Sequence, residues 1–298
     1  MGSSLREAWG VWILASRPKT LVASLVPVAV GGALAYRDTM EFPVLLLVLA
    51  VLFSLLIQVG TNFSNDYFDY LRGADSKRAL GPARAVASGL IRGKTMLAAS
   101  LAILALAFVI GVVLMEFAGA NRNLLWVGLT SVLFAIGYTG GPFPLAYNGL
   151  GDLFVILFFG FVAVCATHYV LVVGVGGEWQ PNWIAPLGVG FVINNLLVVN
   201  NSRDYAEDKS VGKKTLVVAL GQRSGVVLYA MGVLVATLVC PYLDQAIVPV
   251  VWVFPLGLFC LLKLTKASTR EDYGLILLLT ALNIVTYGLA MIWSLLGG

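Results

Sequence analysis

The chain has 298 residues, of which 59% are hydrophobic and only 11% are charged, whereas a soluble protein carries about 25% charged residues. This composition excludes a soluble single domain, a disordered chain and a disulfide scaffold. The three cysteines lie far apart in apolar runs without a C-x-x-C pair, so neither a zinc site nor a redox pair is expected. The sequence therefore predicts a helical protein that crosses the membrane many times.

Nine stretches of the chain are long and apolar enough to cross a bilayer, which takes roughly 17–25 residues. The N-terminal segment is charged as far as Lys19, which is not typical of a signal peptide, and Trp9 and Trp12 indicate a short helix in the membrane interface. The predicted spans are 20–36, 42–63, 96–115, 124–140, 150–174, 183–201, 225–243, 246–264 and 274–296. Because they use most of the chain, we expect one all-α membrane domain over residues 1–298.

The basic residues are distributed unevenly between the two sides of this predicted bundle. All but Arg37 and Arg122 of the 19 Lys and Arg residues fall in the N-terminal segment, in every second connection or at the end of a span beside one. The positive-inside rule places that side in the cytoplasm. We therefore expect an integral protein of the cytoplasmic membrane with a cytoplasmic N-terminus and with Gly298 outside.

The connection after the second span begins with an acidic row. On a helix, Asn62, Asp66 and Asp69 occupy positions i, i+4 and i+7, which lie on one face, and a further acid follows at Asp75. Carboxylates stacked on one face repel each other unless a cation lies between them. Arg72 and other basic residues follow in the same connection, so this segment is unusual for a simple loop.

A second acidic row follows the sixth span, where Asn200, Asp204 and Asp208 occupy positions i, i+4 and i+8. The N-x-x-x-D-Y pattern occurs in both rows, which indicates two similar halves with motifs near 62–75 and 200–215. Hard oxygen ligands of this kind suit Mg²⁺, which takes its remaining ligands from water and substrate phosphates. Mg²⁺ together with Lys and Arg around a cleft predicts a diphosphate site.

Three other interpretations of the charged connections fit the sequence less well. A solvated cytoplasmic face explains mixed charges, but not two acidic rows at helical spacing that begin inside apolar spans. An ion-coupled transporter predicts charges or broken helices at the middle of the membrane, whereas these carboxylates collect at one edge. The D-G-x-x-A-R…G-x-x-x-D-x-x-x-D pattern of CDP-alcohol phosphotransferases is absent.

At these residues the chain resembles the UbiA superfamily of intramembrane prenyltransferases, and within it the 1,4-dihydroxy-2-naphthoate polyprenyltransferase branch. Four segments carry the resemblance: 16–21 (SRPKTL), 62–75 (NFSNDYFDYLRGAD), 81–91 (GPARAVASGLI) and 201–221 with its NSRD, DK and GKKTLVV parts. The resemblance implies a bundle of nine transmembrane helices around a central cavity open to the lipid. It also implies transfer of a polyprenyl chain from a diphosphate to an aromatic ring.

The resemblance also implies roles for individual residues. The catalytic carboxylates are Asp66, Asp69, Asp204 and Asp208. The Mg²⁺ ligands, which helix geometry also favours, are Asn62, Asp66, Asp204 and Asp208. The diphosphate ligands are Arg72, Arg84, Lys209 and Lys213. The tyrosines near the site, Tyr138 foremost and Tyr147 among them, are candidates for stabilising the allylic cation.

The expected acceptor is 1,4-dihydroxy-2-naphthoate, whose carboxylate leaves as CO₂ to give demethylmenaquinol in menaquinone biosynthesis. The candidates for acceptor binding are Arg17, Lys19, Tyr138 and Arg203. The isoprenoid tail is expected beside the small residues Gly149, Gly151 and Gly160. His168 falls past the middle of its span, away from the aspartates, so a packing role is expected. Membrane lipid surrounds the protein, no nucleic acid is expected, and the prenyl chain length and the oligomeric state stay open.

Overall fold

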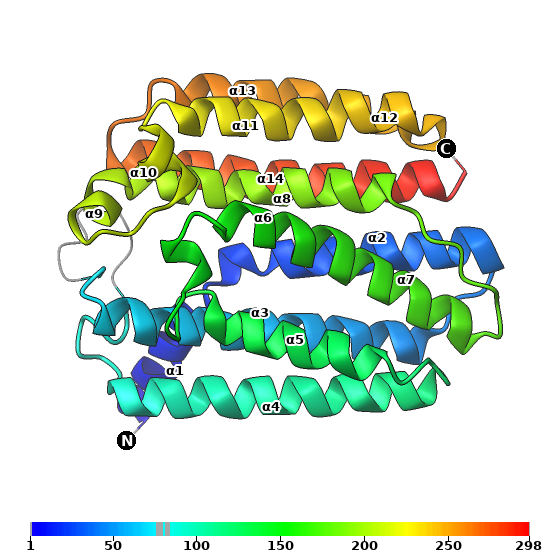
Figure 1. Ribbon diagram of the computed structural model, residues 1–298, viewed down its shortest axis with the longest axis horizontal. Helices are drawn as coiled ribbons and strands as arrows, with labels where there is room; N and C mark the ends of the chain where they lie inside the picture. The colour runs from blue at the N-terminus through cyan, green and yellow to red at the C-terminus, as the bar shows by residue number, and fades with distance from the viewer. Residues whose placement is uncertain (1, 76–79, 81–83, 298) are drawn as a thin grey trace.

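The computed structural model describes residues 2–75, 80 and 84–297, and it is a bundle of long helices that run side by side (Figure 1). Among these described residues the only β-type pairing is an isolated bridge between Asn148 and Lys214. The all-α fold class predicted from composition is confirmed. The Gly81-Pro82-Ala83 part of the third resemblance segment lies outside the described residues.

The first half of the chain forms the helices drawn from blue to green in Figure 1. They are α1 (Gly2–Ser16), η1 (Pro18–Thr20), α2 (Val22–Thr39), α3 (Val44–Leu71), α4 (Gly93–Phe117), α5 (Leu124–Gly137), η2 (Leu145–Tyr147), α6 (Gly151–Val155), η3 (Ile156–Val162) and α7 (Ala163–Gly174). The second half comprises α8 (Ile184–Arg203), α9 (Tyr205–Ser210), α10 (Leu216–Leu220), α11 (Ser224–Leu234), η4 (Val235–Val239), α12 (Cys240–Leu243), η5 (Gln245–Val253), α13 (Phe254–Leu264) and α14 (Arg270–Leu295).

Each of the nine predicted spans coincides with a helix or with a run of consecutive helical segments, but the number that can cross a membrane is smaller. Within the described residues, seven helices are long and apolar enough, and an eighth results if the bent pair Trp9–Thr20 and Val22–Thr39 is one span. α5 is apolar but has only 14 residues. The predicted count of nine is therefore approximate.

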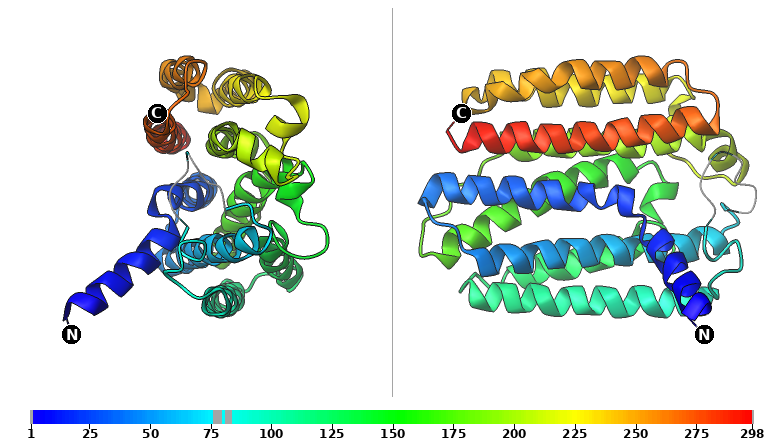
Figure 2. Two further views of the ribbon diagram at one scale, coloured as in Figure 1. Left: turned by 90° about the vertical axis from the view of Figure 1, so that its left-hand side faces the viewer. Right: turned by 180° about the vertical axis from the view of Figure 1, so that it is seen from behind.

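The segment before α2 leaves the bundle at an angle. This orientation is consistent with the interfacial helix that Trp9 and Trp12 predict. Trp9–Thr20 is bent by 52° from α2, and α1 projects from the side of the bundle (Figure 2). The side chains of Trp9 and Ile13 are exposed. Exposed apolar side chains at the edge of a membrane bundle suit the interface between lipid and water.

α8 is the most enclosed of the candidate spans, and its composition reflects this position. In the most apolar 18-residue stretch of α8, 72% is buried inside the protein, compared with 17% of the corresponding stretch of α3. It packs against η3 most closely at Gly160, where an added Cβ would lie 2.5 Å from the carbonyl oxygen of Pro186. Because α8 faces protein rather than lipid, it can carry amides such as Asn194 and Asn195 inside the bundle.

Both acidic motifs lie at the same end of the bundle, the end of α9 and α10 at the left of Figure 1. The chain ends at the other side, where the last turn of α2 carries Arg37 and the turn before α5 carries Arg122. The fold thus gathers the basic residues and both motifs at one end. It leaves the long apolar helices between the two ends to face lipid.

Candidate active site

A small polar cavity lies between the two motifs. The first motif lines it with Asp69 and Asp75, and Arg84 joins them from the following segment, with Nε 3.5 Å from Asp75 Oδ1. The second motif lines it with Asp204, Glu207, Asp208 and Lys213. The tertiary structure therefore brings residues of both motifs to one cavity, as the sequence predicts for a shared site.

The predicted metal ligands Asp66 and Asn62 lie about one and two turns deeper on α3 than Asp69, and they do not line this cavity. Asp66 is 2% exposed and accepts hydrogen bonds from the backbone N–H groups of Ala85 and Val86, at 3.2 and 3.4 Å. Asn62 Nδ2 donates to the carbonyl oxygen of Ser16 at 2.9 Å. In this arrangement the two side chains anchor neighbouring segments, and their role as metal ligands stays a prediction.

Arg72 lies at the end of α3, where the sequence predicts a diphosphate ligand. Its Nε donates to the carbonyl oxygen of Thr139 at 3.2 Å, and Nη2 donates to that of Gly141 at 2.7 Å. These bonds fasten the turn after α5 to the first motif. Arg72 is therefore close to the site, but its donors are directed to backbone carbonyls, so contact with a diphosphate stays a prediction.

The second acidic row is interrupted at Asp204, although the sequence predicts one continuous helical face. α8 ends at Arg203 and α9 begins at Tyr205. Backbone hydrogen bonds at helical spacing continue across the break. The N–H of Asp204 donates to the carbonyl oxygen of Asn200, and the N–H of Asp208 donates to the carbonyl oxygen of Asp204. The predicted spacing is thus preserved, and the break turns α9 across the end of the bundle.

Arg203 is buried and forms a two-point hydrogen bond with its neighbour Asp204. Nε lies 2.6 Å from Oδ1 and Nη2 lies 2.8 Å from Oδ2. The other predicted acceptor-binding cations differ from it, because Lys19 is exposed and Arg17 acts electrostatically on Asp66. Arg17 also has a left-handed backbone, with φ 53°, which is uncommon for a residue with a side chain.

Lys213 and Asp208 form an ion pair in the cavity, with 3.2 Å between Nζ and Oδ1. Burial raises the pKa of Asp208 to about 6 even though Lys213 opposes the shift. Burial lowers the pKa of Lys213, but the negative charges of Asp69, Asp208 and Asp204 outweigh it and raise that pKa above its ordinary value. The ammonium group therefore stays charged inside a largely buried site.

The cavity suits a divalent cation in its chemistry, although Asp75, Asp204 and Asp208 are each paired with a basic side chain. Asp208 Oδ2 is buried and has no hydrogen-bond partner, which leaves one oxygen available to a cation. Within the described part of the chain, no three acidic, His or Cys side chains are already gathered as a metal site. The carboxylates that could converge on a metal ion, because they line the same cavity, are Asp69, Asp75, Asp204, Glu207 and Asp208.

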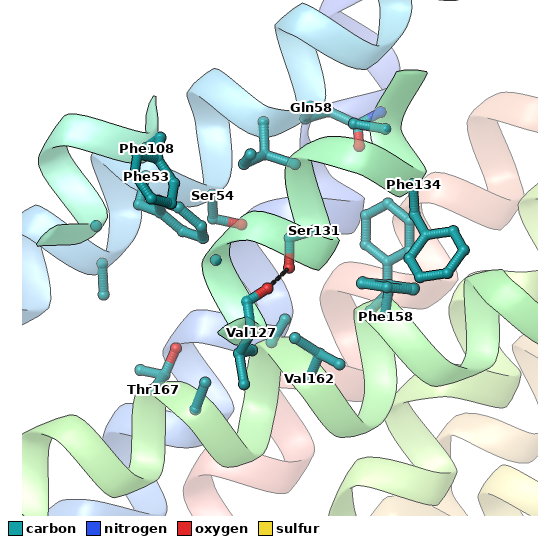
Figure 3. A pocket seen from close by; sticks show the side chains of 18 of the residues that line it. Phe53, Ser54, Gln58, Phe108, Val127, Ser131, Phe134, Phe158, Val162 and Thr167 are labelled. Carbon is teal, nitrogen blue, oxygen red and sulfur yellow. Dashed lines mark hydrogen bonds between the residues drawn. The ribbon is translucent and has the colours of Figure 1, made fainter. Parts of the chain in front are cut away.

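A larger apolar cavity of about 190 Å³ lies inside the bundle between α3, α4, α5, η3 and α7 (Figure 3). Phe53, Phe108, Phe134 and Phe158 form much of its wall, with Gln58 and Ser131 as polar members. Gly149, Gly151 and Gly160, the small residues predicted to lie beside the isoprenoid tail, do not line this cavity. Gly160 packs against α8 instead, and the position of the tail stays a prediction.

Tyr138 connects the apolar cavity with the acidic end of the bundle. Its side chain lines the apolar cavity. The carboxylates of Asp152, Asp69 and Asp208 act electrostatically on its hydroxyl group. Lys209, by contrast, is exposed, and its Nζ lies 5.7 Å from the ring centroid of Tyr205. Tyr138 is thus placed where an apolar chain and a charged group could meet.

Several residues of the site were not assigned a role from sequence. Asp75 and Glu207 line the polar cavity, and Glu207 could have been noticed because it lies one helical turn after Asp204. The buried Asp152 accepts a hydrogen bond from Asn194 Nδ2 at 3.1 Å. This contact joins two helices that are distant in the sequence, so no local sequence pattern predicts it.

His168 lies in α7 toward the opposite end of the bundle, as predicted. It is 1% exposed, with Nε2 2.8 Å from Asp38 Oδ2, and it accepts a hydrogen bond from Trp179 Nε1. Through these contacts His168 joins α7 to the end of α2 and to the segment after α7. His168 therefore has the packing role expected from its position.

The fold and the two-motif site are those of an intramembrane prenyltransferase. The model of the UbiA prenyltransferase family matches residues 24–277, and the chain belongs to this family. The family and the long apolar helices together make it an integral membrane protein.

Among its relatives are proteins named 1,4-dihydroxy-2-naphthoate octaprenyltransferase. The one from Haemophilus influenzae is 34% identical over 240 residues, covering 78% of this chain and 77% of the relative. The one from Mycobacterium tuberculosis is 37% identical and covers 73% and 72%. A UbiA homologue from Archaeoglobus fulgidus bound to GPP and Mg²⁺ has a similar fold, with TM-score 0.63 and 20% identity over 95% of this chain and 99% of that one.

Proposed function

We propose that this protein transfers a polyprenyl chain from polyprenyl diphosphate to 1,4-dihydroxy-2-naphthoate. The products are demethylmenaquinol, CO₂ and diphosphate, so the reaction belongs to menaquinone biosynthesis. The observation that carries the proposal is that one bundle holds a cavity lined by both acidic motifs and an apolar cavity, with Tyr138 in the wall of the apolar cavity and within electrostatic reach of Asp69 and Asp208. The names of the bacterial relatives, at 33–37% identity, support this acceptor.

The reaction has one difficult step, the breaking of the allylic C–O bond as diphosphate leaves. Negative charge builds on the leaving oxygens, and preorganised cations there lower the barrier. Bound Mg²⁺ would supply most of this positive charge. Asp204 and Asp208 would hold the ion together with Asp69 or Asp75, and Asn62 and Asp66 remain proposed ligands by family resemblance. Lys213 and Arg84, which line the same cavity, would contact the diphosphate.

The new C–C bond would form at the ring carbon that carries the carboxylate, and CO₂ would leave with its bonding electrons remaining in the ring. The allylic carbon would lie near Tyr138, which lines the apolar cavity and is within electrostatic reach of Asp69 and Asp208. The isoprenoid tail would occupy the apolar cavity, since each CH₂ group removed from water contributes about 0.8 kcal/mol. Arg17 and Arg203 are the cations inside the site region that could receive the acceptor carboxylate.

We also propose that the motif end of the bundle faces the cytoplasm, with the N-terminus inside and Gly298 outside. The positive-inside rule supports this orientation, because all but two of the basic residues belong, in the sequence, to the N-terminal segment and to the connections and span ends on the motif side. Both substrates are anions, so a cytoplasmic site needs no transport step. The chain would form a single domain of two similar halves, each contributing one acidic motif.

The proposal is tested with purified protein, Mg²⁺, octaprenyl diphosphate and a panel of aromatic acids in detergent. We expect prenylated product only with 1,4-dihydroxy-2-naphthoate, and carboxyl-labelled acceptor should release labelled CO₂ in step with prenylation. A product that retains the label, or a preference for 4-hydroxybenzoate, would contradict the proposal. Omission of Mg²⁺ should abolish both the product and the CO₂.

A further inference from the structure

The side chain of Tyr147, on η2, contacts charged groups from both acidic motifs. Its hydroxyl donates a hydrogen bond to Asp69 Oδ1 at 2.8 Å. The guanidinium carbon of Arg72 lies 5.1 Å from its ring centroid, and Lys213 Nζ lies 5.4 Å from the same centroid. Its carbonyl oxygen accepts a hydrogen bond from the N–H of Lys214 at 3.1 Å. A single residue outside both motifs therefore joins them.

The segment around Tyr147 is fastened to the first motif at further points. Arg72 donates to the carbonyl oxygens of Thr139 and Gly141. The hydroxyl group of Thr139 donates to the side chain of Asn65 at 2.8 Å, and both residues are buried. Segment 138–148 thus lies against the first motif and is held in place by the side chains of Asn65, Asp69 and Arg72.

The chemistry of these contacts suits a positioning role. Burial and the negative charge of Asp69 raise the pKa of the Tyr147 hydroxyl, so this group keeps its proton and stays a donor. A hydrogen bond to one carboxylate oxygen leaves the other oxygen directed elsewhere. The electron-rich ring attracts Arg72 and Lys213 without neutralising them. The sequence made Tyr147 a candidate for stabilising the allylic cation. A ring that already faces two cations is a poor partner for a third.

We propose that Tyr147 is a positioning residue of the diphosphate site, whose hydroxyl orients Asp69 and whose ring places Lys213. Through these two contacts it couples the first motif to the second. The proposal rests on the proposed function, since Asp69 and Lys213 line the cavity assigned there to metal and diphosphate. It adds a residue from a segment that carries neither motif.

The test replaces Tyr147 by Phe, which removes the hydroxyl and keeps the ring. Binding of Mn²⁺ to the detergent-purified protein with inorganic diphosphate is followed by electron paramagnetic resonance. Residues that orient metal ligands contribute about 10–100-fold to metal affinity, so Tyr147→Phe should raise the Kd for Mn²⁺ about tenfold. Tyr205→Phe is the matched control, because Tyr205 is also a half-buried tyrosine beneath a lysine but has no carboxylate contact. Its Kd should stay within about twofold of wild type.

A second measurement separates positioning from general damage to the structure. In an Asp69→Asn background, Tyr147→Phe should have little further effect on Mn²⁺ binding, because the two residues act through one hydrogen bond. Additive effects in this cycle, an unchanged Kd for Tyr147→Phe, or equal weakening by Tyr205→Phe would overturn the proposal.

The readout also distinguishes this proposal from the proposed function. Mn²⁺ binding needs no aromatic acceptor, so wild-type protein that binds Mn²⁺ and diphosphate but prenylates no naphthoate contradicts only the function. In the transfer assay, Tyr147→Phe should raise the half-saturating Mg²⁺ concentration about tenfold and recover much of its turnover at saturating Mg²⁺. A fall in turnover that excess Mg²⁺ does not restore would contradict the positioning role.

Discussion

Lys213 and Asp208 face each other across 3.2 Å in the cavity between the two acidic motifs, and the second carboxylate oxygen of Asp208 is buried without a hydrogen-bond partner. One oxygen is thus neutralised by the ammonium group, while the other is available to a cation. Because this pair is separated by only one turn of chain, it forms within the second motif. Its partners across the cavity come from the first motif.

Replacing Asp208 by Asn should lower prenyl transfer by about 100-fold or more, the scale expected when an electrostatic contact in the transition state is lost. The thermal midpoint should change little, since the change removes charge from a cavity and not packing from a core. Turnover and thermal unfolding in detergent check both expectations. Glu116→Gln, an exposed change at the opposite end, is the control, and near-wild-type turnover of Asp208→Asn would disprove the assignment.

Metal binding should weaken in acid because the proton and the cation compete for Asp208. Its pKa of about 6 lies above the ordinary value since burial disfavours the charged carboxylate. The carboxylate is therefore ionised at pH 7 and mostly protonated at pH 5, and Mn²⁺ affinity should fall about tenfold between them. Titrations at the two pH values measure this. If Asp208→Asn retains the same pH dependence, another group is responsible.

The apolar cavity should limit how long a tail the protein accepts. Gly128 lies on α5 ten residues before Tyr138, which is about 15 Å along a helix, beyond the reach of a geranyl group but not of an octaprenyl chain. Gly128→Leu should lower kcat/KM for octaprenyl diphosphate about tenfold more than for geranyl diphosphate, the cost of a few misplaced methylene groups. Gly128→Ala is the control, because an added Cβ would make only an ordinary contact of 3.6 Å with Phe108. Equal losses with both donors would place the tail elsewhere.

The orientation of the bundle can be read by labelling introduced cysteines in a protein that lacks the three native ones. Ser88→Cys and Lys214→Cys are exposed at the motif end, and Asn123→Cys is exposed at the other end. A membrane-impermeant thiol reagent should label the first two in inside-out vesicles and the third in right-side-out vesicles. The reverse pattern would place the motifs outside the cell.

The contact between η3 and α8 should tolerate no extra atom at Gly160. An added Cβ would lie 2.5 Å from the carbonyl oxygen of Pro186 and 3.0 Å from Cα of Gly190, so Gly160→Ala should destabilise the bundle by about 1–3 kcal/mol. Gly137→Ala is the matched control, because no atom lies within 4 Å of its added Cβ. Thermal unfolding in detergent should separate the two variants, and equal midpoints would show that the helices shift apart freely.

The sequence alone was sufficient for the fold class and for the position of both motifs. Apolar runs of about 20 residues form helices in a membrane because only internal hydrogen bonds can satisfy the backbone there. The spacing of Asn62, Asp66 and Asp69 places them on one helical face wherever that helix packs. These are local properties of consecutive residues, which is why they could be predicted before any contact was known.

Only the tertiary structure decided which partners these side chains meet. Asp66 faces backbone N–H groups of the turn at Ala85, whereas Asp69 faces the hydroxyl of Tyr147, although both lie on the same face of α3. The apolar cavity likewise lies among phenylalanines of α3, α4, α5 and η3, and Gly160 does not line it. The physical reason is that helix packing depends on how side chains from distant segments fit together. The spacing of residues within one helix carries no information about that fit.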